Sequence, residues 1–106
     1  MLLYHATLAG NKRSIGKHGV STDRSQGATR SVWGVEGSMK WWAMVHCVRR
    51  HGGRIEDVVV LEIDTQDTPV HRFRGGLWYS MHTWHPSQIR RVMTFDELSR
   101  SPTEEG

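Results

Sequence analysis

Residues 57–64, with the sequence DVVVLEID, decide the fold class of this chain. From Val58 to Leu61 aliphatic side chains follow one another, without the alternation expected of a strand that has one face in water. An unbroken run of this kind is typical of a strand that protein covers on both faces. We therefore expect an interior strand here, with packed layers above and below it.

The segment before this strand predicts the clearest helix of the chain. The helix should begin at Gly37-Ser38 and end at Gly52-Gly53, because paired glycines interrupt helical periodicity. Apolar or large side chains recur at helical spacing, so we expect one buried face. That face would consist of Met39, Trp42, Ala43, His46, Cys47 and Arg50. Trp42 is thus expected in the core, whereas Trp41 lies on the flank of this face and can be buried or exposed.

The rest of the chain predicts short strands and one more helix. Strands are expected at residues 2–6, 31–35, 77–80 and 89–93, with a further short segment at 70–74, a helix at 11–17 closed by Gly19, and a helical turn at 94–98. Residues 21–30 are polar and should form a loop. The prediction is an α+β fold with two helices packed on a strongly bent, mostly antiparallel sheet of five or six short strands. Residues 1–98 would form one domain, and the acidic residues 99–106 a disordered tail.

Charge gives a first indication of the ligand. The chain has 106 residues, with 14 Lys and Arg against 11 Asp and Glu, for a formal net charge of +3. Residues 1–95 carry 13 Lys and Arg against 7 Asp and Glu, and residues 96–106 carry 1 against 4, so the expected folded part is more basic than the whole chain. This balance favours an anionic ligand, such as a dinucleotide, a phosphate or a nucleic acid, although solubility alone accounts for many basic domains.

The cysteine count, the histidine spacing and the hydropathy indicate where the protein is located and whether it binds a metal. The single cysteine, Cys47, cannot form an internal disulfide, and it falls on the predicted buried helix face as a small, inert side chain. The 7 histidines match no recognised metal-site spacing, so we expect no metal. No apolar stretch reaches the length of a membrane helix, and the N-terminus lacks the features of a signal peptide. We expect a cytoplasmic protein that does not bind membranes.

Two segments carry residues suited to a ribose and a heterocycle. His5, at the end of the first strand, can hydrogen-bond a ribose hydroxyl, and the backbone that follows it can pair with a planar amide. A purely structural histidine is the other interpretation. Trp33 stands beside Gly34 on a short strand, where it can stack on a heterocycle whose approach the glycine permits.

Arginines near the ends of two elements are candidate phosphate ligands. Arg50 ends the long helix on its predicted buried face, which favours a guanidinium directed at a phosphate or a carboxylate. Arg72 and Arg74 alternate with apolar neighbours, so both are expected on one face of a strand. That face can bind phosphate, or it can be a charged edge that discourages aggregation, and both interpretations stay open.

The order of these short motifs resembles a known superfamily. Along residues 2–93 the chain carries His5-Ala6-Thr7, a short helix ending in Gly19, Val32-Trp33, a helix introduced by Ser38, the aliphatic strand, and Pro86-x-x-Ile89. In this order they resemble the ADP-ribosyltransferase fold. Within it, the likeness is closest to the NAD-binding lobe of the RNA 2′-phosphotransferases, through Arg50-His51-Gly52 before the aliphatic strand and Gly76-Leu77-Trp78-Tyr79 after it.

The resemblance implies a cofactor, a reaction and a set of site residues. The cofactor would be NAD, and the reaction the transfer of ADP-ribose to a phosphorylated or nucleic-acid acceptor. The implied residues are His5, Ala6, Thr7 and Trp33 for NAD and Arg50, as the catalytic group, for the substrate phosphate. Arg72 and Arg74 are added as phosphate ligands on the residue pattern alone. One alternative is a catalytically inactive nucleotide- or protein-binding module on the same fold, because residues 75–78 lack the Glu that protein-modifying transferases carry there. Another is a nucleic-acid binder that uses basic and stacking side chains.

Overall fold

The computed structural model describes residues 1–22 and 30–100 of the chain. In this part the chain forms three α-helices and one sheet of six strands. The helices are α1 (Lys12–His18), α2 (Lys40–His51) and α3 (Phe95–Arg100). The strands are β1 (Leu2–Leu8), β2 (Val32–Val35), β3 (Val58–Asp64), β4 (His71–Arg74), β5 (Leu77–Ser80) and β6 (Ile89–Thr94). No helix in these residues is both long and apolar enough to cross a membrane.

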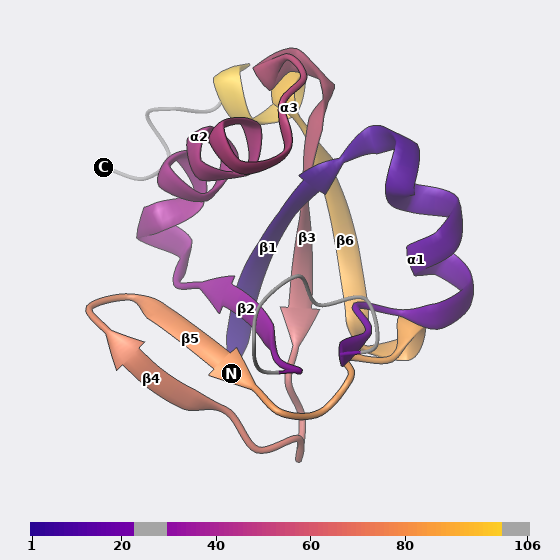
Figure 1. The fold of residues 1–106 in the computed structure, drawn as a ribbon, viewed down its shortest axis with the longest axis vertical. Helices are drawn as coiled ribbons and strands as arrows, with labels where there is room; N and C mark the ends of the chain where they lie inside the picture. Colours follow the sequence, from indigo (N-terminus) through magenta and orange to yellow (C-terminus); the bar gives the residue numbers. More distant parts are fainter. Residues whose placement is uncertain (23–29, 101–106) are drawn as a thin grey trace.

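The sheet has the strand order β4-β5-β2-β1-β3-β6, and all neighbouring strands are antiparallel (Figure 1). The longest ladder joins β1 to β3, from the pair Leu2 and Asp64 to the pair Leu8 and Val58. On its other edge β3 pairs with β6, so the aliphatic strand is interior, as its sequence predicts. The predicted α+β class with an antiparallel sheet is confirmed.

Both faces of β3 are buried, by different partners. Val58 and Val60 pack against Met44 and Cys47 of α2, and we call this side of the sheet the α2 face. Leu61 and Ile63 pack on the other side against Trp84, together with Ile15 of α1, and we call that side the α1 face. The two helices lie on opposite sides of the central strands in Figure 1. This arrangement explains why the sequence of β3 does not alternate.

The buried face of α2 differs from the one that its periodicity predicts. Its buried residues are Ala43, Met44 and Cys47, whereas Trp42 is 46% exposed. A helix turns by about 100° per residue, so a face centred on these three positions leaves Trp42 roughly 150° away. There Trp42 stacks on His46, with ring centroids 5.0 Å apart. The prediction that Trp42 lies in the core is wrong.

The helix ends follow the glycines in the sequence. Gly19 follows α1 with φ of 72°, and Gly52 follows α2 with φ of 78°. Such positive φ values are accessible to glycine at little cost, so both predicted helix stops are confirmed. Helix α3 runs to Arg100, two residues past the predicted domain end. The predicted loop at 21–30 falls mostly, and the predicted tail partly, outside the described residues.

Candidate functional site

His5 lies where the sheet opens between β1 and β2. These two strands share one pair of facing residues, Tyr4 and Val35. A continued ladder would place His5, Ala6 and Thr7 opposite Gly34, Trp33 and Val32, but the strands diverge instead (Figure 1). The His5 side chain bridges the two strands, because its Nδ1 lies 2.7 Å from the carbonyl oxygen of Trp33. We call this opening the β1–β2 gap.

The bridge determines the chemical state of the His5 ring. A carbonyl oxygen only accepts hydrogen bonds, so Nδ1 must carry the hydrogen and donate it. Burial lowers the pKa of His5, the hydrogen bond to Trp33 partly offsets this, and the nearby charge of His51 lowers it further. At neutral pH the ring is therefore uncharged, and its Nε2 is a hydrogen-bond acceptor.

Ala6 and Thr7 continue β1 along the same gap. Ala6 pairs with Val60 of β3 and packs into the core on the α2 face. Thr7 is buried, and its hydroxyl accepts a hydrogen bond of 3.0 Å from the side chain of Asn11. Both side chains are thus used internally. The two residues can offer a ligand only backbone groups. These are the N–H and C=O groups of β1 that are directed at β2, because the ladder between the two strands does not extend past Tyr4 and Val35.

The indole of Trp33 and the His5 ring lie on opposite faces of the sheet. It alternates with Gly34, which approaches Leu3 and Trp84 on the α1 face, so its indole lies on the α2 face. His5 follows Leu3 by two residues and therefore lies on the α1 face. The structure joins the two residues through the Trp33 carbonyl, and it does not place the indole beside the His5 ring.

Arg50 lies at the end of α2 and is exposed to solvent. The prediction that it sits on the buried helix face is wrong, because Arg50 lies in the last turn of α2 and is exposed there. Its neighbour His51 is close enough to His5 to influence the pKa of that ring. The structure shows this effect of His51, and it does not place the Arg50 side chain at the β1–β2 gap.

Arg72 and Arg74 do not share a face. Arg72 pairs with Trp78, and Arg74 pairs with Leu77, the preceding residue of β5. Because successive strand residues face opposite sides, the bulge at Phe73 turns the two arginines to opposite faces. Strand β4 is an edge strand at the opposite end of the sheet from the end of α2 (Figure 1). The structure therefore separates these arginines from Arg50.

Glu36 is a carboxylate that sequence reasoning did not single out. It directly follows β2, and its side chain accepts a hydrogen bond of 2.8 Å from the indole N–H of Trp78. Its backbone N–H donates to the carbonyl of Gly76, also over 2.8 Å. The antiparallel pairing of β2 with β5 thus places an acidic side chain beside residues 75–78, where the sequence itself has none. A long separation along the chain conceals this proximity.

Other reactive groups lie apart from the gap. Cys47 is buried in the core and its pKa is raised by burial, which matches the small inert side chain predicted for it. One cavity of about 250 Å³ lies between α1 and β6, and a polar one of about 350 Å³ lies beside the 82–88 segment. Neither is lined by His5, Trp33 or Arg50. Within residues 1–22 and 30–100, no three His, Cys, Asp or Glu residues are grouped so as to hold a metal ion.

Comparison with known proteins gives no family assignment. No family model matches this chain, and no curated protein matches its sequence. The functional argument therefore rests on the geometry of the β1–β2 gap and on its chemistry.

Proposed function

We propose that this chain binds NAD at the β1–β2 gap and transfers ADP-ribose to a phosphorylated or nucleic-acid acceptor, as RNA 2′-phosphotransferases do. The observation that carries the proposal is the His5 bridge across the gap. The Nδ1 of this ring is held by the Trp33 carbonyl, and a neutral ring in this tautomer has Nε2 as its acceptor. A histidine held in this way is suited to orienting a ribose hydroxyl, which would donate to Nε2.

The backbone beside His5 suits the nicotinamide. In an antiparallel strand, alternate residues direct their N–H and C=O groups to each neighbouring strand. Along Ala6 and Thr7 the groups directed at β2 have no ladder partner in that strand, and a carboxamide offers both a donor and an acceptor to pair with them. The proposed site thus binds the amide through backbone and the ribose through a side chain.

The proposed reaction exchanges one bond at the ribose for another. The bond between the ribose C1′ and the nicotinamide nitrogen breaks, and its electron pair leaves with nicotinamide. An oxygen of the anionic acceptor then forms the new bond to C1′. Arg50 is exposed at the end of α2, and in this proposal its guanidinium holds the acceptor phosphate, because a charge placed in advance lowers the barrier for such a step.

A non-catalytic nucleotide- or protein-binding module is the second candidate. It is supported by the place of Arg72 and Arg74 on the edge strand β4, which β5 and β2 separate from β1. Both candidates share the NAD or nucleotide site and differ in turnover. A single buried thiol, Cys47, suits the reducing cytoplasm, which we propose as the location for either one.

Calorimetric titration with NAD tests the binding site. We expect the wild-type chain to bind NAD and His5→Ala to bind at least about tenfold more weakly, since it loses the Nε2 acceptor. His18→Ala, which removes an exposed histidine at the end of α1, is the matched control and should bind like wild type. No binding by the wild-type chain at millimolar NAD would contradict the proposal.

Release of nicotinamide separates the two candidates. The chain is incubated with NAD and with 2′-phosphorylated RNA, phosphorylated DNA ends or protein acceptors, and free nicotinamide is measured by chromatography. We expect release that depends on an acceptor and that falls in Arg50→Ala while NAD binding persists. Binding of NAD without release under any of these conditions would favour the non-catalytic module.

A further inference from the structure

The strands β2, β4 and β5 carry a second surface, on the opposite face of the sheet from the His5 ring. On the α2 face of these three strands, aromatic rings from neighbouring strands contact one another. Trp33 contacts Tyr79 and Phe73, with ring centroids 5.2 Å and 5.5 Å apart, and His71 contacts Tyr79 at 5.4 Å. We call Trp33, His71, Phe73 and Tyr79 the aromatic platform.

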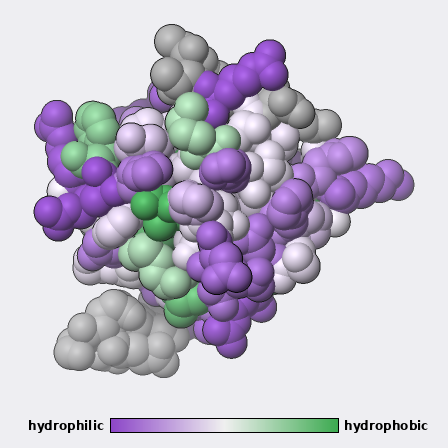
Figure 2. All heavy atoms as spheres, turned by 90° about the horizontal axis from the view of Figure 1, so that it is seen from below, coloured by the Kyte–Doolittle hydropathy of each residue, from purple (hydrophilic) through white to green (hydrophobic). Residues whose placement is uncertain are grey.

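The platform is open to solvent. Phe73 is 53% exposed and Trp33 36%, and His71 is also exposed. The helix α2 packs over β1 and β3, and β4 and β5 extend beyond it in Figure 1. Contiguous exposed aromatic rings of this kind are typical of a binding surface. Seen from below, this end of the molecule is otherwise mainly hydrophilic, with small hydrophobic patches (Figure 2).

The charge around the platform indicates an anionic ligand. No residue of β2, β4 or β5 is acidic. Arg74 lies on the platform side, with its guanidinium 5.2 Å from the centre of the Phe73 ring. The bulge in β4 produces this arrangement, since it turns Phe73 and Arg74 toward the platform and leaves Arg72 on the other face. The carboxylate of Glu36, which directly follows β2, is bound to Trp78, and Trp78 lies on the other face.

From these observations we propose that the aromatic platform binds single-stranded nucleic acid. Unpaired bases stack on exposed aromatic rings, and their phosphates pair with nearby cations, so alternating rings and an arginine on one sheet face match both parts of such a strand. A duplex keeps its bases stacked inside and would meet only the arginine. This surface does not depend on the proposed NAD site, because its side chains lie on the opposite face of the sheet from the His5 ring.

Fluorescence anisotropy of an end-labelled oligouridylate of about 12 nucleotides, titrated without NAD, tests this proposal. We expect binding that weakens as salt rises, with a matched DNA strand showing whether the sugar matters. Phe73→Ala should weaken binding by about tenfold, the effect of losing one stacked base. Arg74→Ala should lower the slope of log affinity against log salt by about 0.7, the effect of one phosphate contact on a single strand.

The chain offers a matched control for each variant. Trp41→Ala removes an aromatic side chain that is 43% exposed but contacts Phe95 of α3, and it should leave the affinity unchanged. Arg72→Ala removes the same charge as Arg74→Ala from the opposite face of β4, and it should change the salt slope less. Circular dichroism melting of each variant verifies that the fold is retained, as the exposure of Phe73 leads us to expect.

Three outcomes would overturn the proposal. These are no binding of either single strand at low salt, equal affinity for a duplex of the same length, and equal losses in Phe73→Ala and Trp41→Ala. The test is independent of the proposed function, because it contains no NAD. Binding that persists in His5→Ala would support the platform even if the NAD site failed its own test.

Discussion

His5 shows how one hydrogen bond can determine what a side chain offers to a ligand. Because the Trp33 carbonyl occupies Nδ1, the tautomer follows from the backbone geometry, and Nε2 becomes the acceptor. Burial favours the neutral ring and lowers its pKa, so the charge state and the tautomer support the same role. The sequence could suggest His5 as a candidate but could not indicate its tautomer, since that depends on a carbonyl 28 residues away.

The lowered pKa of His5 predicts a pH-dependent stability. The folded chain holds this proton less tightly than the unfolded chain, in which the pKa is near 6.5. The contribution of His5 to stability is therefore fully present above about pH 6.5 and is lost as the pH falls below that value. Urea unfolding at pH 7.5 and pH 5.5 should show a smaller loss of stability for His5→Gln, which cannot be protonated, than for wild type. A direct titration of His5 by NMR with a pKa above 6.5 would contradict this prediction.

At the scale of elements, local signals located the helices and strands better than they located their faces. Glycines mark the ends of α1 and α2, and the aliphatic run marks β3, because these are local backbone and burial preferences. The rotation of α2 and the bulge in β4 depend on which neighbours each element meets. Periodicity placed Trp42 in the core, whereas packing with β1 and β3 selected Met44 instead.

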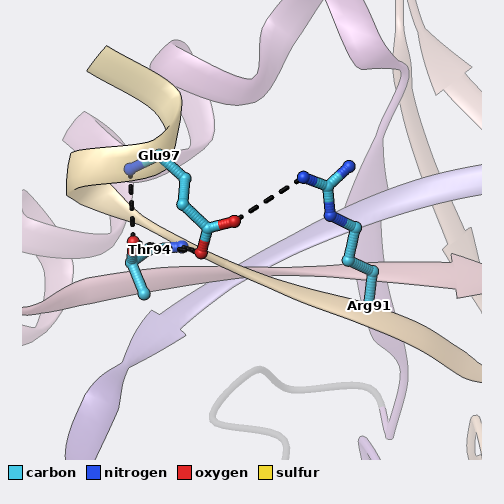
Figure 3. A network of polar contacts seen from close by, with 3 residues as sticks. All are labelled: Arg91, Thr94 and Glu97. Carbon is cyan, nitrogen blue, oxygen red and sulfur yellow. Dashed lines mark hydrogen bonds and ion pairs between the residues drawn. The ribbon is translucent and has the colours of Figure 1, made fainter. Parts of the chain in front are cut away.

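Helix α3 begins with a capping box that its sequence contains, Thr94-Phe95-Asp96-Glu97 (Figure 3). The Thr94 hydroxyl accepts from the Glu97 N–H, and the Glu97 carboxylate accepts from the Thr94 N–H, each at 3.2 Å. These bonds, with Arg91 3.6 Å away, lower the pKa of Glu97. The network attaches the short helix to the end of β6.

Loss of this cap should destabilise the domain. We expect Thr94→Ala to lower the free energy of unfolding by about 1 kcal/mol, the usual effect of removing a threonine cap. Ser99→Ala removes a hydroxyl from the same helix that bonds only to carbonyls of the preceding turn, and it should have little effect. Urea denaturation of both variants measures the difference, and similar values for the two would contradict the role of the cap.

At the scale of the whole molecule, the fold class was predictable and the strand order was not. Binary patterns indicate strands and their burial, and they led to an antiparallel α+β sheet, which is confirmed. They carry no information on which strands become neighbours across long separations, so neither the divergence of β1 from β2 nor the proximity of Glu36 to β5 could be predicted. Both features of the candidate site arise from this order.

The central claim is that NAD occupies the β1–β2 gap, and a crystal structure of the chain with NAD tests it most directly. We predict that a hydroxyl of the nicotinamide ribose lies within hydrogen-bond distance of His5 Nε2, while Nδ1 keeps its bond to the Trp33 carbonyl. The carboxamide should pair with the backbone of Ala6 or Thr7. NAD bound on the aromatic platform, or crystals grown at saturating NAD with an empty gap, would contradict the claim.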